Sequence, residues 1–216
     1  MTDILYQVLL WLPALVIAIV FHEVAHGWVA YAFGDPTAKN AKRLTLNPIP
    51  HIDPIGTVIL PTVLAISGAP AFGWAKPVPV RADKLRNPRV HMMLVALAGP
   101  GANFLLAIVG ALIWALGIVQ SEFLLQMLFG FILVNVVLGL FNLLPLPPFD
   151  GGHVVEGLLP RPLAARYRRL DRWGLLILIL LLLVVPALFN VNIVGELIMP
   201  PAMAIMRFLL GASPGF

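Results

Sequence analysis

The fold of this chain is organised around residues 21–28, FHEVAHGW, at the end of the apolar run Ile4–Phe21. His22 and His26 are four residues apart, so on an α-helix they lie one turn apart on one face, and both imidazoles can reach a single metal ion. Glu23, between them, is close enough to take a proton from a water that the metal activates. Ionisable groups at membrane depth are costly and usually functional. The stretch predicts a metal site in an apolar helix, against the alternative of two structural histidines beside an incidental glutamate.

The composition is that of a polytopic membrane protein. Of the 216 residues, 60% are hydrophobic and 11% are charged, which leaves no room for a sizeable extramembrane domain. There is no cysteine, so thiolate ligands, disulfides and iron–sulfur clusters are excluded, and a metal ion must be held by His, Asp or Glu. The net charge of +4 comes from basic residues in short loops beside apolar runs, where they set topology and contact anionic lipid. Nucleic acid is not an expected partner.

The apolar runs predict an all-α fold of about five transmembrane helices. These lie at Ile4–Phe33, which Pro13 interrupts, and at Met92–Ile118, Phe123–Leu144, Trp173–Phe189 and Ile193–Leu210. We expect a single integral-membrane domain over 1–216, with a catalytic core at about 4–152 followed by C-terminal helices at 173–210.

Two stretches between the first and second spans have a different character. Ile55–Ala69 is apolar but only about 15 residues long, whereas a span needs about 20, so we expect it to be re-entrant or interfacial. Residues 73–81, GWAKPVPVR, contain two prolines that exclude helix, so a short extended or β-like stretch is expected there. It is either a surface loop or an edge that contacts an extended substrate.

A second chemical signal is the stretch NLLPLPPFDGG at residues 142–152. Its prolines end the preceding helix, and irregular backbone at membrane depth is tolerated only inside protein or beside a water-filled cavity. Asp150 is followed by two glycines, which predict a sharp turn with the carboxylate at its head. Alone this would be an ordinary turn. Beside a histidine pair that lacks a third ligand, it predicts that Asp150 completes the metal site.

The charges in the loops predict which ends of the helices lie on the same side of the membrane. If Ile55–Ala69 does not cross, the basic segments 39–43, 76–89 and the basic loop 161–172 lie together, and the positive-inside rule makes that side cytosolic. The same layout brings the end of the first helix, with its histidines, to the side of Asp150.

On these stretches the sequence resembles the site-2 proteases, the intramembrane zinc metalloproteases of peptidase family M50. The resemblance rests on HEVAH at 22–26, on the N-x-x-P-x-x-P-x-D-G form of 142–151, and on the run AGPGAN that ends at Asn103. The compact form with GWAKPVPV at 73–80 is similar to small bacterial members without PDZ or CBS domains.

The resemblance implies one zinc ion bound by His22, His26 and Asp150, with Glu23 as general base. Asn103 and Asn142 are candidate contacts to the substrate or transition state, although Asn103 is also explained as a helix-packing residue. The expected location is the bacterial cell membrane, as a multi-pass protein with its active site toward the cytosol.

The expected function is zinc-dependent hydrolysis of peptide bonds in or near transmembrane helices, in regulated intramembrane proteolysis or clearance of membrane peptides. The expected partners are the lipid bilayer and a membrane-protein substrate with a transmembrane helix; no oligomeric state is indicated. One alternative is a non-proteolytic zinc-binding membrane protein or an ion transporter that uses the same His, Glu and Asp cluster. Another is a different zincin branch whose third ligand is a glutamate, for which Glu122, Glu156 and Glu196 are the available residues.

Overall fold

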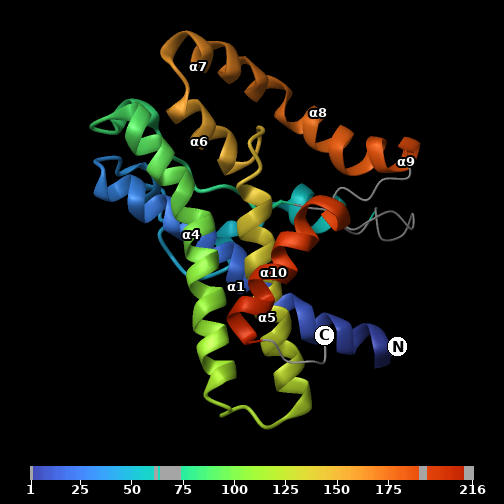
Figure 1. Cartoon of the computed structure of the whole chain (residues 1–216). Coiled ribbons are helices and arrows are strands. Elements are labelled where there is room, and N and C mark those ends of the chain that lie inside the picture. The colour runs from blue at the N-terminus through green and yellow to red at the C-terminus, as the bar shows by residue number, and fades with distance from the viewer. Residues whose placement is uncertain (1, 61–62, 64–73, 190–193, 212–216) are drawn as a thin grey trace.

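The computed structural model describes residues 2–60, 63, 74–189 and 194–211. Within these ranges all regular structure is helical, and no strand is found among them. Figure 1 shows long helices that cross in the middle of the molecule and a chain of shorter helices at one end. The predicted all-α membrane architecture is confirmed in these residues.

Among the described residues, three helices are long and apolar enough to cross a membrane: α1 (Thr2–Ala32), α4 (Pro88–Ala115) and α5 (Glu122–Asn142). Large apolar side chains on them are exposed, among them Leu105 at 62% and Leu112 at 60%. An apolar surface of this extent suits contact with lipid. The interruption predicted at Pro13 is wrong, because α1 continues through it. A proline inside a transmembrane helix is tolerated where neighbouring groups satisfy the freed carbonyl.

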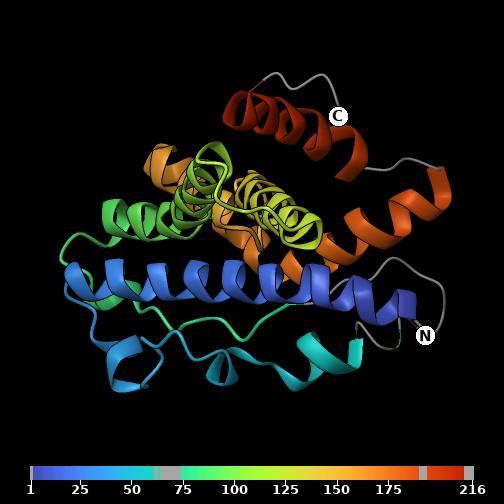
Figure 2. The ribbon, with the colours of Figure 1, turned by 90° about the horizontal axis from the view of Figure 1, so that it is seen from below.

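Small residues let α4 and α5 pack closely as an antiparallel hairpin. A Cβ atom at Gly110 would lie 2.8 Å from Ile132 Cγ1, so the helices approach closely there. Such close approach is a main source of helix association in lipid. α1 packs on one side of the hairpin and α10 (Met199–Leu210) on the other, as Figure 2 shows. Ala202 and Met206 of α10 join Ile132 in a fully buried core.

The C-terminal part is a series of short helices. They are α6 (Asp150–Leu158), α7 (Arg161–Tyr167), η4 (Arg168–Trp173), α8 (Gly174–Ile179), η5 (Leu180–Val184), α9 (Val185–Phe189) and η6 (Val194–Ile198), which leads into α10. The basic segment 161–172, expected as a loop, is therefore helical, and its proline sits in the first turn of α7, where a missing N–H costs nothing. The two predicted C-terminal spans are helical at 174–189 and 194–210; each is shorter than the roughly 20 residues of a typical span.

The connection between α1 and α4 lies along the face of α1 that points away from α5 (Figure 2). It contains α2 (Thr37–Asn40), η1 (Ile49–His51), η2 (Pro54–Ile59) and η3 (Ala82–Lys84). Residues 74–81 run without regular structure, as their prolines predict; we call them the extended segment. The predicted re-entrant stretch Ile55–Ala69 lies mostly outside the described residues, and its described start belongs to η2.

Candidate metal centre

Three side chains from two helices converge on one point. His22 and His26 lie on α1, and Asp150 is the first residue of α6. Asp150 Oδ2 is 3.1 Å from His22 Nε2 and 3.3 Å from His26 Nε2. One ligand atom from each residue lies within 4.8 Å of the other two. The side chains are only 7%, 12% and 18% exposed, so the three residues predicted from the sequence form one largely buried cluster.

Hydrogen bonds determine which ring nitrogen of each histidine faces this cluster. His26 Nδ1 is 2.7 Å from Val95 O, and His22 Nδ1 is 2.7 Å from Asn103 Oδ1. Both oxygens can only accept, so in each neutral ring Nδ1 carries the proton and Nε2 holds a lone pair. Both lone pairs face Asp150 Oδ2, a buried oxygen to which no residue in the described part of the chain donates a hydrogen bond. Three electron-pair donors facing one another repel unless a cation lies between them, so the arrangement fits a metal ion.

Asn103 holds His22 through a buried network that crosses three helices. Asn103 is on α4, and its Nδ2 donates to Ala18 O of α1 at 3.0 Å and to Asn135 Oδ1 of α5 at 2.9 Å. Asn135 Nδ2 in turn donates to Phe131 O at 2.9 Å. Both asparagines are 0% exposed. Asn103 therefore orients the His22 ring, in the way that residues behind the ligands of a metal site hold those ligands in place. A direct contact of Asn103 with substrate stays a prediction.

Asn135 was not predicted from the sequence. It lies 32 residues after Asn103 on another helix, so no local spacing connects the two. The available signal was a primary amide in the middle of an apolar span, where an unsatisfied polar group is costly and a partner on a neighbouring helix is expected.

Gly99 on α4 makes room for both imidazoles. A Cβ atom at this position would lie 2.4 Å from His26 Nε2 and 2.7 Å from His22 Cε1. The rings themselves pack edge to face, with centroids 4.6 Å apart. Gly99, in the run AGPGAN, thus makes room for the candidate metal centre.

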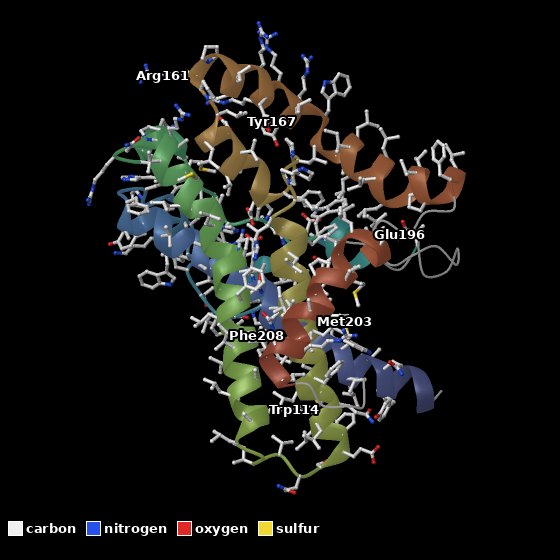
Figure 3. All side chains as sticks on the ribbon, viewed as in Figure 1. Trp114, Arg161, Tyr167, Glu196, Met203 and Phe208 are labelled. Carbon is white, nitrogen blue, oxygen red and sulfur yellow. The ribbon has the colours of Figure 1, made fainter. Side chains whose placement is uncertain are left out.

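Asp150 is positioned by the segment 143–149 that leaves α5. Phe149 N–H donates to Leu146 O at 3.0 Å. The hydroxyl of Tyr167 on α7, which Figure 3 labels, donates to Pro145 O at 2.7 Å. These bonds anchor irregular backbone inside the protein, where backbone without regular structure is tolerated at membrane depth.

The sharp turn predicted at Asp150 is wrong, because α6 begins at this residue. Neither Gly151 nor Gly152 adopts a positive φ. The reason for glycine is space: a Cβ atom at Gly151 would lie 2.3 Å from both Leu143 O and Leu144 O. α6 therefore starts in direct backbone contact with the end of α5, and this contact sets the place of the carboxylate.

Glu23, next to His22 on α1, is half-buried. Its Oε2 accepts a hydrogen bond from the backbone N–H of Val78, in the extended segment, at 2.7 Å. Asn142 ends α5, and its amide donates to Leu138 O of its own helix at 3.0 Å. Its role as a substrate contact stays a prediction.

Zinc suits this donor set. It binds imidazole nitrogen and carboxylate oxygen, and catalytic zinc sites use three protein ligands so that a fourth position is open to water or substrate. His22, His26 and Asp150 supply three such ligands, and the chain offers no thiolate.

The known proteins similar to this chain are named as zinc metalloproteases. The sequence model of peptidase family M50 matches residues 117–185, which include Asp150. A Bacillus subtilis protein named "Putative zinc metalloprotease YwhC" is 39% identical over 196 residues, 84% of this chain and 85% of that protein. A Mycolicibacterium smegmatis protein named "Putative zinc metalloprotease Rip2" is 31% identical over 176 residues, 77% of this chain and 63% of that longer protein. No solved structure matches.

The identity to the Bacillus subtilis protein extends over most of both sequences. Only a shared fold and ancestry account for a match of this extent. The chain therefore belongs to peptidase family M50, the site-2 protease family of zinc metalloproteases.

Proposed function

We propose that the chain is an intramembrane endopeptidase that binds one zinc ion and cleaves peptide bonds in or near transmembrane helices of membrane proteins. The observation that carries the proposal is the convergence of two imidazole lone pairs with a buried carboxylate oxygen. The imidazoles belong to α1, a helix long and apolar enough to span a membrane, and the carboxylate belongs to Asp150 of α6. Buried ionisable groups of this kind in a membrane helix mark functional sites.

In this proposal His22, His26 and Asp150 hold the zinc ion and Glu23 is the general base. When held by these residues, zinc would supply an activated water, with a pKa of about 7, and an electrophile to polarise a carbonyl. Glu23 takes the proton of the attacking water and delivers it to the leaving amine. Asn103 and Val95 O keep the two imidazoles in the tautomer that leaves Nε2 unprotonated.

The substrate proposed is a helix in the membrane or beside it. The carbonyls of a helix are engaged in its own hydrogen bonds, so the substrate must unwind locally before a peptide bond can react. We place the site toward the cytosol of a bacterial cell membrane, because the basic helix α7, which begins at Arg161, lies at the same end of α4 and α5 as α6 (Figures 1 and 3).

The test combines zinc content with cleavage. Liposomes are prepared that contain wild type, Glu23→Gln or Asp150→Ala. Each protein is reconstituted together with single-pass peptides whose helices contain glycine or proline near one end. Cleavage products are identified by mass spectrometry. Wild type should contain about one zinc ion per chain and cleave. Glu23→Gln should keep zinc and lose at least ~10²-fold in activity, because a general base contributes about 10²–10⁴-fold. Asp150→Ala should lose both.

Three outcomes would contradict the proposal. Full activity in Glu23→Gln would exclude Glu23 as the base. Zinc in the wild type without cleavage of any peptide would favour a non-proteolytic zinc protein, and a wild type without zinc would favour a polar pathway for ions.

A further inference from the structure

We infer that the backbone N–H of Val78 is a positioning group for the catalytic base, and that the extended segment 74–81 exists to present it to Glu23. The inference rests on the proposed function, because it takes Glu23 as the base. It assigns the extended segment a role in catalysis that differs from contact with an extended substrate.

Val78 is attached to one face of α1 at two points. Its N–H donates to Glu23 Oε2 at 2.7 Å. Its side chain lies over Gly27, where a Cβ atom would be 2.9 Å from Val78 Cγ1. Glu23 and Gly27 are four residues apart and so lie on the same helix face. Val78 is only 6% exposed, so this contact is inside the protein.

The residues on both sides of Val78 are also anchored. Lys76 N–H donates to His51 O at 2.9 Å, and Lys76 O accepts from Arg43 Nη2 at 2.7 Å. Arg81 N–H donates to Asp35 Oδ2 at 2.6 Å. Arg43, His51 and Asp35 are all buried. The segment is therefore held before and after Val78 by groups that are themselves fixed in the fold.

The two prolines beside Val78 add to this rigidity. Pro77 and Pro79 have fixed φ angles and no N–H. Between Lys76 and Val80, Val78 thus carries the only backbone donor, and the chain has little freedom to turn that donor away from Glu23. In the sequence Pro77-Val78-Pro79 the Val78 N–H is therefore held in position to donate to Glu23 Oε2.

A fixed donor at Oε2 has a direct consequence for catalysis. A glutamate side chain has three rotatable bonds, and a base is effective only within hydrogen-bond reach of its proton. With Oε2 bound by Val78, the carboxylate is held in one orientation and Oε1 is the oxygen that takes the proton from water. A charge-assisted hydrogen bond to a carboxylate is stronger than a neutral one, so the orientation is firmly set.

The first test removes the N–H while keeping an extended backbone. In Val78→Pro, kcat should fall roughly ten- to hundredfold, the value of a hydrogen bond to a charged group. KM should stay within about twofold, and zinc per chain should not change. Val78→Ala, the matched control, keeps the N–H and loses only packing, so its kcat should stay within about threefold of wild type.

Three results would overturn the inference. An unchanged kcat in Val78→Pro would show that the bond has no catalytic role. A raised KM with unchanged kcat would show that the segment contacts the substrate instead. Equal losses in Val78→Ala and Val78→Pro would assign the effect to packing on Gly27.

The second test needs neither activity nor a folded proline variant. In protein labelled with ¹⁵N-valine, the Val78 amide proton should resonate downfield and exchange slowly, as expected of a donor to a carboxylate. Glu23→Ala should shift that signal upfield and speed its exchange at least tenfold, whereas Glu122→Gln, an exposed glutamate at the start of α5, should leave it in place. A Val78 signal indifferent to Glu23→Ala would overturn the inference.

The two proposals fail in different ways. If the chain is not a protease, the wild type cleaves nothing while the Val78 signal still responds to Glu23. If only the present inference is wrong, the wild type cleaves, Glu23→Gln does not, and Val78→Pro behaves like wild type.

Discussion

At the scale of single residues, Asn135 is linked to the candidate metal centre through Asn103, without contacting His22 itself. It accepts from Asn103, which in turn accepts from His22. In Asn135→Leu the Asn103 amide loses one of its two buried acceptors and keeps only Ala18 O, so Asn103, and with it His22, is less firmly oriented. Zinc affinity should fall about tenfold, the lower end of the range for residues behind a ligand. Competition with a chromogenic chelator measures this directly.

Asn142→Leu is the control for that experiment, because the Asn142 amide bonds within its own helix. It should leave zinc affinity within about twofold of wild type. Similar losses in both variants would mean that any amide-to-leucine change in α5 disturbs the site, and the network would lose its assigned role.

Gly99 provides a second prediction at this scale. In Gly99→Ala the new methyl group would overlap His26 Nε2 and His22 Cε1, so at least one imidazole must move. Zinc per chain should drop well below one, and the melting temperature in excess zinc should fall. Gly101→Ala is a matched control in the same helix, since a Cβ atom there meets no atom of the described residues within 4 Å. Alanine is also the better helix former, so this variant should be neutral or slightly more stable.

At the scale of elements, Asp35 anchors the extended segment and makes its stability depend on pH. Burial raises the pKa of Asp35, but hydrogen bonds from Arg81 N–H and from Thr37 outweigh it, so the pKa lies below the ordinary value of 3.8. The carboxylate therefore stabilises the fold above pH ~4, and this contribution is lost as the pH falls through the lower pKa of the folded protein.

Thermal melts of wild type and Asp35→Asn at several pH values measure this contribution. The variant should melt lower by a constant amount from pH 7 to about 5, because a buried hydrogen-bonded carboxylate contributes ~1–3 kcal/mol. The gap should narrow below pH ~4. A gap that stays constant down to pH 2.5 would show that the charge of Asp35 has no part in stability.

The sequence predicts elements that have a strong local signal. It does not predict elements whose secondary structure depends on contacts with other parts of the chain. The histidine pair follows from helix periodicity, and α1, α4 and α5 follow from apolar length. α6 and α7 were expected as a turn and a loop, because glycine, proline and arginine dominate their sequences. The start of α6 depends instead on a contact with another part of the chain: only glycine fits at position 151 against the carbonyls of Leu143 and Leu144, directly after α5. The Val78 contact could not be foreseen because a backbone N–H has no residue signature.

At the scale of the whole molecule, the position of the long helices predicts an orientation in the membrane. The α4–α5 turn and the basic helices α7 and η4 lie at opposite ends of the molecule (Figure 1). Since the chain has no cysteine, single cysteines at Ser121 and Arg169, both exposed, report on the two ends. With an impermeant maleimide on intact cells, Ser121→Cys should be labelled and Arg169→Cys should be labelled only after lysis. The reverse pattern would place the active site on the outer side, and labelling of both from outside would contradict the span assignment.

The proposed ligands of the metal centre are far apart in the sequence, with His22 and His26 in the first helix and Asp150 after the third long one. During synthesis the ribosome must therefore add more than half of the chain after α1 before a complete zinc site can exist, a delay on the order of ten seconds at ~5–20 residues per second. Because Asp150 is added late, the three-ligand site is incomplete during most of synthesis, and the proposed protease stays inactive until α6 has formed.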